Sequence, residues 1–407
     1  METLEYCRSC KSRELIELID LGEQYFSGHF PSFNEDISKL KAPLVVVECM
    51  NCRLVQLRDT FELSQMYGDN YGYRSGLNSS MVLHLKDKSK KLIDNFKLSR
   101  DSKILDIGAN DGTFLKNFSK LGSQLVAIDP TINKWAEFYD FDVEKYSLLF
   151  TEDNISKTEL DTFDLITSIS MFYDVPEPIN FAKVIKNKLN KDGIWHIELS
   201  YLPTMLKKNS YDTICHEHLE YYSLNSLNFI CKEVGLQILD IDFNDVNGGS
   251  IEINLTHSDS KTYKPKIDIN QEIKKEIKEI DTETWRKFSI SVIKNIENIK
   301  KTISEIKDSS KNICGIGAST KGNIILQASK LSSSEIDYIG EINPNKYGRY
   351  TPGSNIKIVP ETQFEQDVPD YMFVLPWHFK NHIIKNKKNY LDHGGKLIFP
   401  LPEIEII

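Results

Sequence analysis

The sequence of 407 residues predicts an α/β protein in which two Rossmann-like sheets follow a small N-terminal domain with four cysteines. Two segments, at residues 104–115 and 312–323, each read as an apolar strand, a glycine-rich turn and the start of a helix. Four cysteines near the N-terminus form two C-x-x-C pairs. With 40% hydrophobic and 27% charged residues, the chain has the composition of a globular protein of two or three domains.

Charge and hydropathy exclude several classes of partner. The formal net charge of −9 comes without a basic stripe and argues against nucleic-acid binding. No apolar run approaches the roughly 18 residues that span a membrane, and Met1–Tyr6 does not resemble a signal peptide. We therefore expect a cytoplasmic protein that contacts no membrane, while nothing in the sequence specifies its oligomeric state.

The first element is the cysteine domain, which we place at residues 1–67. Cys7 and Cys10 form one pair, and Cys49 and Cys52 form the other. Two thiolates separated by two residues fit adjacent corners of a tetrahedral zinc site. Because four protein ligands leave no position for a substrate, structural zinc is expected rather than catalytic zinc. Redox or unpaired cysteines are the alternative.

The second element is a doubly wound parallel sheet, in a domain that we place at residues 68–258. Apolar strands alternate with helical segments from residue 102 to residue 198. The predicted strands are 103–107, 124–128, 164–169 and 193–198.

The turn after the first of these strands indicates a cofactor. Its sequence, Asp106 to Gly112, fits the acid-x-G-x-(G or N)-x-G pattern of S-adenosylmethionine (SAM) loops, whereas dinucleotide loops read G-x-G-x-x-G. Asp106 can orient the ammonium group of SAM, and Asp129, at the end of the next strand, can accept hydrogen bonds from ribose hydroxyls. An ordinary glycine turn is the alternative. The candidate cofactor-binding residues are Asp106, Gly108, Ala109, Asn110, Gly112, Asp129, Ser168 and Ser170.

The densest group of reactive side chains lies between residues 211 and 223. His216, Glu217, His218, Tyr221 and Tyr222 fall within seven residues, and histidine and tyrosine are types that move protons in enzymes. Histidines two residues apart cannot share one helical face, so a zinc-protease site of the H-E-x-x-H type is not expected. A buried hydrogen-bonded network that supports the fold is the alternative.

The third element, at residues 259–407, begins with a linking helix and continues as a second Rossmann-like domain. Apolar residues from 292 to 306 recur at steps of four and three, which predicts an amphipathic helix packed between two domains. The turn that follows contains Lys321 and three glycines that could cradle a phosphate. Arg349, in a loop rich in turn-forming residues, suits phosphate recognition, although a solvated loop would have the same composition.

Several of these segments together resemble the three-domain sugar C-methyltransferases that act on nucleotide-linked 4-ketosugars. The matching segments occur in the family's order; they are Cys7–Cys10, Cys49–Cys52, Tyr71–Asn78, Asp106–Gly112, Cys215–Ser223, Asn247–Ser250, Gly317–Asn323, Gly348–Gly353 and Leu375–Trp377. The resemblance implies an N-terminal zinc domain, a central class I methyltransferase sheet and a C-terminal domain that binds the nucleotide sugar. It also implies a role in deoxysugar biosynthesis.

The resemblance further implies roles for individual residues. It suggests His218 as the base that removes a proton next to the ketone, with Glu217 and Tyr73 positioning the substrate or stabilising the enolate. The candidate catalytic residues are His218, Glu217, Tyr73, His216 and Tyr222. The candidate substrate-binding residues are Tyr71, Arg74, Asn247, Lys321, Asn323, Arg349 and Tyr350.

Two positions depart from the family pattern. Cys215 stands where members often have a tyrosine, and the segment 171–176, with Asp174, stands where they often have a histidine. These departures keep an O-methyltransferase acting on a nucleotide-activated sugar as the alternative, because a hydroxyl acceptor needs only a base such as His218 or His216. A nucleic-acid methyltransferase fits the charge less well, and a dehydrogenase fits the Asn110-containing loop less well. A non-catalytic assembly protein with remnant loops is a third class, which calorimetry showing no SAM binding would favour.

Overall fold

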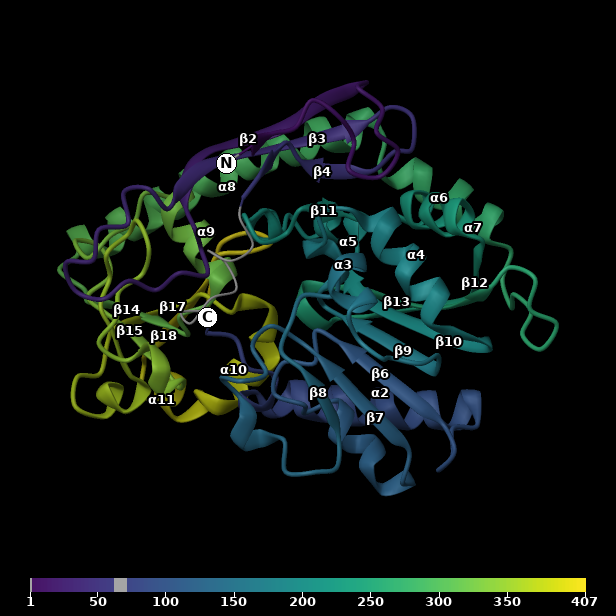
Figure 1. Ribbon diagram of the computed structural model, residues 1–407. Coiled ribbons are helices and arrows are strands. Elements are labelled where there is room, and N and C mark those ends of the chain that lie inside the picture. Colours follow the sequence, from purple (N-terminus) through teal and green to yellow (C-terminus); the bar gives the residue numbers. More distant parts are fainter. Residues whose placement is uncertain (1, 62–71) are drawn as a thin grey trace.

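The computed structural model describes residues 2–61 and 72–407, which form three main sheets (Figure 1). The N-terminal sheet is antiparallel, in the order β11-β4-β3-β2. Its strands are β2 (Leu15–Tyr25), β3 (Lys41–Cys49), β4 (Val55–Leu57) and β11 (Glu220–Tyr221). A separate pair joins β1 (Glu2–Thr3) to β5 (Asp59–Thr60). The N-terminal sheet therefore takes its last strand from the run of histidines and tyrosines far along the chain.

The central sheet has the order β12-β13-β10-β9-β6-β7-β8 and is parallel apart from the pairings of β13. Its strands are β6 (Lys103–Ile107), β7 (Gln124–Ile128), β8 (Glu144–Tyr146), β9 (Phe163–Ile169), β10 (Leu189–Ser200), β12 (Leu236–Asn244) and β13 (Ser250–His257). The four strands predicted from the sequence are confirmed.

Helices cover both faces of this sheet (Figure 1). Alternate residues of a strand point to opposite faces, so Leu105 and Ile107 join one core while Ile104 joins the other. The helices are α2 (Ser79–Phe96), α3 (Glu152–Ser156), α4 (Pro178–Lys188), α5 (Leu202–Lys207), α6 (Leu224–Val234) and α7 (Ile269–Glu276).

The segment after the cofactor turn differs from the prediction. A 3-10 helix at Leu115–Leu121 replaces the expected α-helix start. The Asn117 side chain donates hydrogen bonds to the carbonyls of Thr113 and Phe114, both at 3.0 Å. These bonds compete with the regular i to i−4 ladder of an α-helix.

The C-terminal sheet has the order β16-β15-β14-β17-β18-β19 and is parallel except at its last strand. Its strands are β14 (Ile313–Ile316), β15 (Ile339–Glu341), β16 (Ile358–Pro360), β17 (Tyr371–Val374), β18 (Lys396–Phe399) and β19 (Glu405–Ile406). The helices α9 (Thr320–Ala328), α10 (Lys380–Asn386) and α11 (Lys388–Asp392) complete this part.

A long helix, α8 (Thr282–Asp308), links the N-terminal and C-terminal sheets. Its buried residues Val292, Ile299 and Ile303 share one core with Leu44 of β3 and Ile313 of β14. Figure 1 shows the helix running behind β2 and β3. The prediction of a helix packed between two domains is confirmed. Within the described ranges, no helix combines the length and apolar character needed to cross a membrane.

Candidate active site

A cavity of about 180 Å³ opens beside the carboxyl ends of β6, β7 and β9. Four of the predicted cofactor residues line it: Gly108, Asn110, Asp129 and Ser170. Gly108 has a φ of 76°, and a Cβ there would lie 2.9 Å from Cγ of Met171. Only glycine fits this turn without strain, so the backbone itself forms the cavity wall.

Asp129 is positioned to accept hydrogen bonds from a ligand in this cavity. Its Oδ1 accepts from the backbone N–H and the hydroxyl of Thr131, at 2.6 and 2.5 Å, and its Oδ2 accepts from the backbone N–H of Asn110 at 3.0 Å. Burial raises the pKa of Asp129, and these hydrogen bonds oppose that rise. A carboxylate oxygen has two lone pairs, so Oδ2 retains the capacity to accept from a ribose hydroxyl.

The other predicted cofactor residues do not line the cavity. They are Asp106, Ala109, Gly112 and Ser168. Asp106 accepts a hydrogen bond from the Thr167 hydroxyl at 2.6 Å, and burial raises its pKa to about 7. Ser168 is fully buried and accepts from the indole N–H of Trp195. These residues support the wall from behind.

The segment before α2 forms part of the same wall. Asn110 accepts from the N–H of Ser75 at 3.0 Å and donates to the carbonyl of Tyr73 at 3.2 Å. Asp111 accepts from the N–H of Gly76 at 2.9 Å. Asn110 and Asp111, inside the cofactor motif, therefore hold Tyr73 against the cavity. Tyr71 lies outside the described residues.

A second cavity, of about 480 Å³, lies next to the first. It is bounded by residues from all three parts of the chain, including Gly28 and Phe30 of the N-terminal part. Tyr73, Met81, Ser170 and Asp174 line both cavities. Two molecules bound in the two cavities would therefore meet at this shared wall. The predicted residue Arg74 also lines the second cavity, with its guanidinium 4.0 Å from the ring centre of Phe138.

His218 lines the second cavity in a defined tautomer. Its Nδ1 lies 2.9 Å from the carbonyl oxygen of Thr213, and a carbonyl can only accept, so Nδ1 carries the proton. In the neutral ring, Nε2 is then the proton acceptor. Burial, together with the charge of Lys321, lowers the pKa of His218 to about 3.

Glu217 also lines the second cavity, but its carboxylate is held by the N-terminal part of the chain. It accepts from the N–H of Gly28 at 2.9 Å and from the hydroxyl of Ser27 at 3.2 Å. A Cβ at Gly28 would lie 2.5 Å from Oε1 of Glu217, so the close approach requires glycine. Burial raises the pKa of Glu217.

Two of the predicted catalytic residues lie away from both cavities. His216 is fully buried between Phe26 and Phe61, and its Nε2 lies 3.1 Å from the carbonyl oxygen of Ala42. Tyr222 is fully buried and stacks on Phe172, with ring centres 5.1 Å apart. The local sequence groups these side chains with His218, but the fold points them into the core.

Lys321 and Asn247 connect the two cavities. The Lys321 ammonium lines the second cavity and donates to the carbonyl of Asn247 at 2.8 Å. The Asn247 side chain donates to the hydroxyl of Ser170, which lines both cavities, at 3.1 Å. Asn247 and Ser170 both have positive φ angles, 55° and 54°. This tight turn places Lys321, from the C-terminal part of the chain, next to the central sheet.

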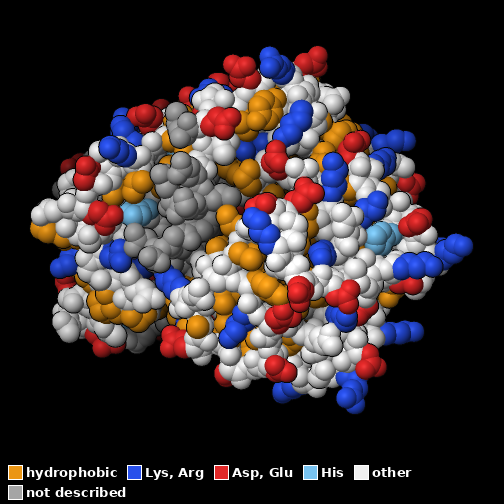
Figure 2. All heavy atoms as spheres, viewed as in Figure 1, with side chains coloured by type: hydrophobic (Ala, Val, Ile, Leu, Met, Phe, Trp, Pro, Cys, Tyr) orange, Lys and Arg blue, Asp and Glu red, His pale blue; other side chains and the backbone are white. Residues whose placement is uncertain are grey.

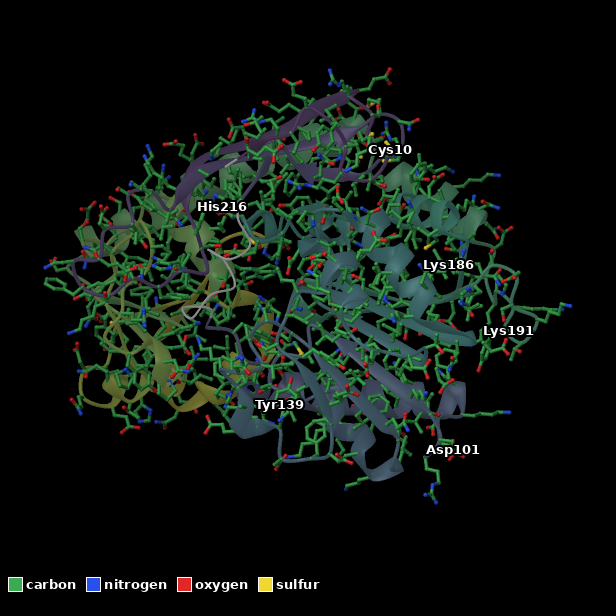
Figure 3. The ribbon with its side chains drawn as sticks, in the orientation of Figure 1. Cys10, Asp101, Tyr139, Lys186, Lys191 and His216 are labelled. Atoms are coloured by element: carbon green, nitrogen blue, oxygen red, sulfur yellow. The ribbon has the colours of Figure 1, made fainter. Side chains whose placement is uncertain are left out.

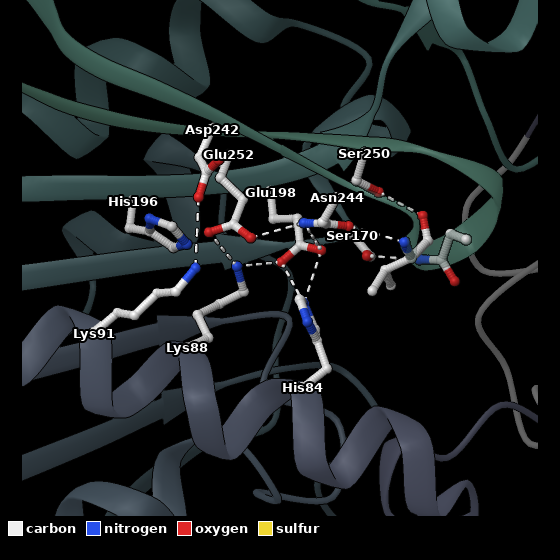
Figure 4. Close-up of polar contacts among 12 residues, drawn as sticks. His84, Lys88, Lys91, Ser170, His196, Glu198, Asp242, Asn244, Ser250 and Glu252 are labelled. Carbon is white, nitrogen blue, oxygen red and sulfur yellow. Dashed lines mark hydrogen bonds and ion pairs between the residues drawn. The ribbon is translucent and has the colours of Figure 1, made fainter.

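A buried charge cluster supports this turn from behind (Figure 4). Lys88 of α2 lies 2.5 Å from Glu198 and 2.7 Å from Glu252, and His84 contacts Glu198 at 2.9 Å. Burial opposes ionisation of Glu198, but His84 and Lys88 hold its pKa at about 2. Asn244 donates to Glu252 and accepts from the N–H of Val246. The cluster thus fixes both α2 and the turn that carries Asn247.

Three of the predicted substrate-binding residues hold the N-terminal part in place and do not line the cavity. Asn323 donates to the carbonyl of Ser27 at 2.7 Å, and Arg349 donates to the carbonyl of Phe30 at 2.9 Å. The backbone N–H of Tyr350 donates to the carbonyl of Pro31. Arg349 is therefore placed as a clamp between two parts of the chain.

Other residues of the second cavity were missed by the sequence reasoning. His378, His382 and Lys387 line it from the segment around α10. Burial and the charge of Lys321 lower the pKa of His378 to about 3. Lys346, which lies near Arg349 in the sequence, also lines the cavity, 4.4 Å from the ring centre of Phe30. No motif spacing marks His378, His382 or Lys387, which the fold alone brings to this cavity.

The four cysteines form one cluster. The sulfur atoms of Cys7 and Cys52 lie 3.4 Å apart, as do those of Cys10 and Cys49, and all four lie within 4.8 Å of one another. Zn–S bonds of about 2.3 Å in a tetrahedron separate neighbouring sulfurs by about 3.8 Å, so the donor set fits zinc. Figure 3 shows Cys10 at the end of the N-terminal sheet that lies over the central domain.

Three family descriptions match the chain in sequence order. Residues 7–67 match "Putative zinc binding domain", residues 81–241 match "Methyltransferase domain", and residues 245–402 match "C-methyltransferase C-terminal domain". Together with the cofactor cavity and the cysteine cluster, these matches define the class. The chain is a SAM-dependent methyltransferase whose three parts match a zinc-binding domain, a methyltransferase domain and a C-methyltransferase C-terminal domain.

Individual proteins are similar to this chain over different shares of its length. The chain is 28% identical to C-methyltransferase NovU of Streptomyces niveus over 99% of its own length and 97% of that protein. It is 22% identical to the ubiquinone biosynthesis O-methyltransferase of Hydrogenovibrio crunogenus, over 46% of this chain and 83% of that protein. The solved structure of the PH0226 protein from Pyrococcus horikoshii gives a TM-score of 0.39 at 14% identity, covering 49% of this chain and all of that one.

Proposed function

We propose that this enzyme transfers a methyl group from SAM to the carbon next to the ketone of a nucleotide-activated keto-sugar. The observation that carries the proposal is the wall shared by the two cavities, with His218 in the larger one. SAM would be held by Gly108, Asn110 and Asp129, and when bound it supplies an electrophilic methyl group. The keto-sugar would occupy the larger cavity.

His218 is suited to act as the base. A ketone acidifies the C–H bond beside it, and proton removal gives an enolate whose carbon is nucleophilic. Since Nδ1 of His218 is bound to the Thr213 carbonyl, Nε2 is available to take that proton. Tyr73 lines both cavities and so can contact the acceptor from the cofactor side.

Lys321 is suited to bind the diphosphate of the nucleotide. It lies at the start of α9, where unpaired backbone N–H groups favour anions. Among the described residues, its ammonium donates one hydrogen bond, to Asn247, and an ammonium has three N–H groups. An anion here would cancel the charge that lowers the pKa of His218, so substrate binding would strengthen the base.

The surface agrees with a small-molecule substrate. On the face shown in Figure 2, basic and acidic side chains are interspersed and not gathered into a basic stripe of the kind that binds nucleic acid. The proposal includes a role in deoxysugar biosynthesis and a cytoplasmic location. It also includes the division of the chain into three domains at residues 1–67, 68–258 and 259–407.

The test is a reaction of the purified enzyme with methyl-labelled SAM and a nucleotide 4-ketosugar. We expect NMR to show the label on a carbon next to the carbonyl, together with loss of the proton at that carbon. In deuterated water without SAM, the same proton should exchange. Absence of both transfer and exchange would refute the proposal.

The second candidate is O-methylation of a nucleotide-activated sugar. Asp174 favours it, because this carboxylate lies in the shared wall and can accept a hydrogen bond from a hydroxyl of the acceptor. An O-methyl product in the same NMR experiment, without proton exchange beside the ketone, would establish this alternative.

A further inference from the structure

The loop that carries His218 ends in the sheet of the cysteine domain. Glu220 and Tyr221 form β11, which pairs with Gln56 and Val55 of β4. Leu219 directly follows His218, and its carbonyl accepts a hydrogen bond from the N–H of Leu57 at 2.8 Å. A strand of two residues makes few ladder hydrogen bonds, so its position needs a further anchor.

Arg8 supplies a contact at this point. It lies between Cys7 and Cys10 and is only 2% exposed. Its backbone N–H donates to the side chain of Gln56 at 2.8 Å, and its guanidinium donates to the carbonyls of Leu57 and Asp59 at 3.3 and 3.2 Å. Arg8 therefore connects the first cysteine pair to β4 and to Asp59 of β5.

The same guanidinium faces the strand after His218. Nε of Arg8 lies 3.8 Å from Oε1 of Glu220, and the two side chains are 1% and 0% exposed. Burial raises the pKa of the Glu220 carboxyl well above its ordinary value, and the nearby Arg8 guanidinium opposes that rise. A buried guanidinium without a polar partner is costly, so removal of either side chain leaves the other uncompensated. Glu220, two residues from His218, therefore lies beside Arg8 as its buried polar neighbour.

We propose that Arg8 is a positioning residue for His218. Through its contact with Glu220, Arg8 connects the four-cysteine centre to the catalytic loop. The proposal rests on the proposed role of His218 as the base. Zinc bound by the cysteines would fix the Cys7–Cys10 turn and with it the backbone of Arg8. The zinc-binding domain would then contribute to the geometry of the reaction as well as to stability.

The first test compares Arg8→Met with Arg53→Met. Arg53 follows the second cysteine pair and also binds a glutamate, Glu48 at 2.9 Å, but among the described residues neither side chain makes a hydrogen bond or ion pair with residues 211–223. We expect R8M to lower kcat about a hundredfold, as a displaced catalytic group does, with the Kd for SAM and one zinc per chain retained. R53M should keep kcat within about twofold. Equal kcat values for the two variants would overturn the proposal.

A double mutant tests whether the effect passes through Glu220. If it does, Arg8→Met and Glu220→Met together should lower kcat no further than the more severe single variant. Multiplied losses in the double mutant would mean that the two residues act separately and would overturn the proposal.

Hydrogen exchange gives a readout independent of turnover. In zinc-loaded R8M, we expect faster exchange in residues 213–222, with residues 104–112 unchanged. Arg8→Lys, which keeps the charge but loses the planar fork, should give an intermediate rate and serves if R8M does not fold. Wild-type exchange in both variants would overturn the proposal. Because exchange needs no substrate, this result stands even if the keto-sugar assignment fails.

Discussion

The two cavities are built from the chain in opposite ways. The cofactor cavity is lined by residues between Tyr73 and Phe181, most of them at the ends of successive strands of one sheet. The larger cavity is lined by residues from Gly28 to Lys387, so the N-terminal, central and C-terminal parts all contribute. One cavity depends on local turns, whereas the other depends on long-range packing.

This difference separates residues that bind from residues that hold the binding parts together. In the cofactor cavity, the backbone of the motif is itself the wall. In the larger cavity, His218 and Lys321 reach the interior, while Asn323 and Arg349 are occupied in holding the loop at residues 27–33. Pairs of variants that contrast the two roles test the comparison directly.

The largest effect is expected at His218. Replacement by asparagine should lower kcat about a thousandfold, because it removes the base. The Kd for SAM should be unchanged, since His218 does not line the cofactor cavity. Product formation and deuterium exchange of the keto-sugar measure the loss.

The matched control for this variant is His216→Asn, two residues away. His216 contacts the Ala42 carbonyl in the core, so we expect a lower Tm and a kcat within about tenfold of the wild type. A folded H216N variant as inactive as H218N would show that the cavity assignment of the two histidines is wrong.

The next effect concerns the diphosphate. Lys321→Met should raise the KM for the nucleotide sugar about thirtyfold, which corresponds to loss of a charged hydrogen bond. Steady-state kinetics at saturating SAM measure it. Arg349→Met is the control and should change this KM less than about threefold, because Arg349 contacts the Phe30 carbonyl. A larger KM change in R349M than in K321M would reverse the roles assigned to the two residues.

A smaller effect is expected in the cofactor cavity. Asp129→Asn should weaken SAM binding about tenfold, since an amide accepts fewer hydrogen bonds from a ribose than a carboxylate does. Calorimetry with SAM measures it. Ser168→Ala provides the contrast, with a Kd within about twofold, because Ser168 binds Trp195 behind the wall. The reverse order of the two Kd values would contradict the placement.

The smallest effect is a shift in the pH profile. The acid limb of kcat/KM reports the base in the free enzyme. A His218 pKa of about 3 keeps the ring neutral down to about pH 4, so the limb should lie well below pH 6. Lys321→Met removes a positive charge that lowers this pKa, so the limb should move upward. A limb at the same pH in both enzymes would show that Lys321 does not act on His218.

The features that the sequence predicts well are those in which cause and effect are close in the chain. The strands 103–107 and 124–128 follow from apolar runs, Gly108 follows from the turn after the first strand, and Asp129 follows from its place at the end of the second. Each C-x-x-C pair predicts two neighbouring ligands of one zinc ion, and the four ligands of a structural zinc site predict that the two pairs meet.

The features that the sequence does not predict depend on contacts with backbone groups, which leave no pattern of side chains in the sequence. Arg349, Asn323 and His216 each bind a backbone carbonyl of the N-terminal part, and any residue type offers such a carbonyl. His378 and Lys387 reach the larger cavity through the placement of α10. The role of individual site residues in catalysis stays a prediction until the variants are measured.

The shared strand β11 has a consequence for synthesis on the ribosome. The first three strands of the N-terminal sheet emerge early, but β4 has an unpaired edge until residues 220 and 221 leave the exit tunnel. Unpaired edges invite association between chains. A nascent chain therefore completes its first sheet only after most of the central sheet has been made, and a fragment ending near residue 61 should aggregate when expressed alone.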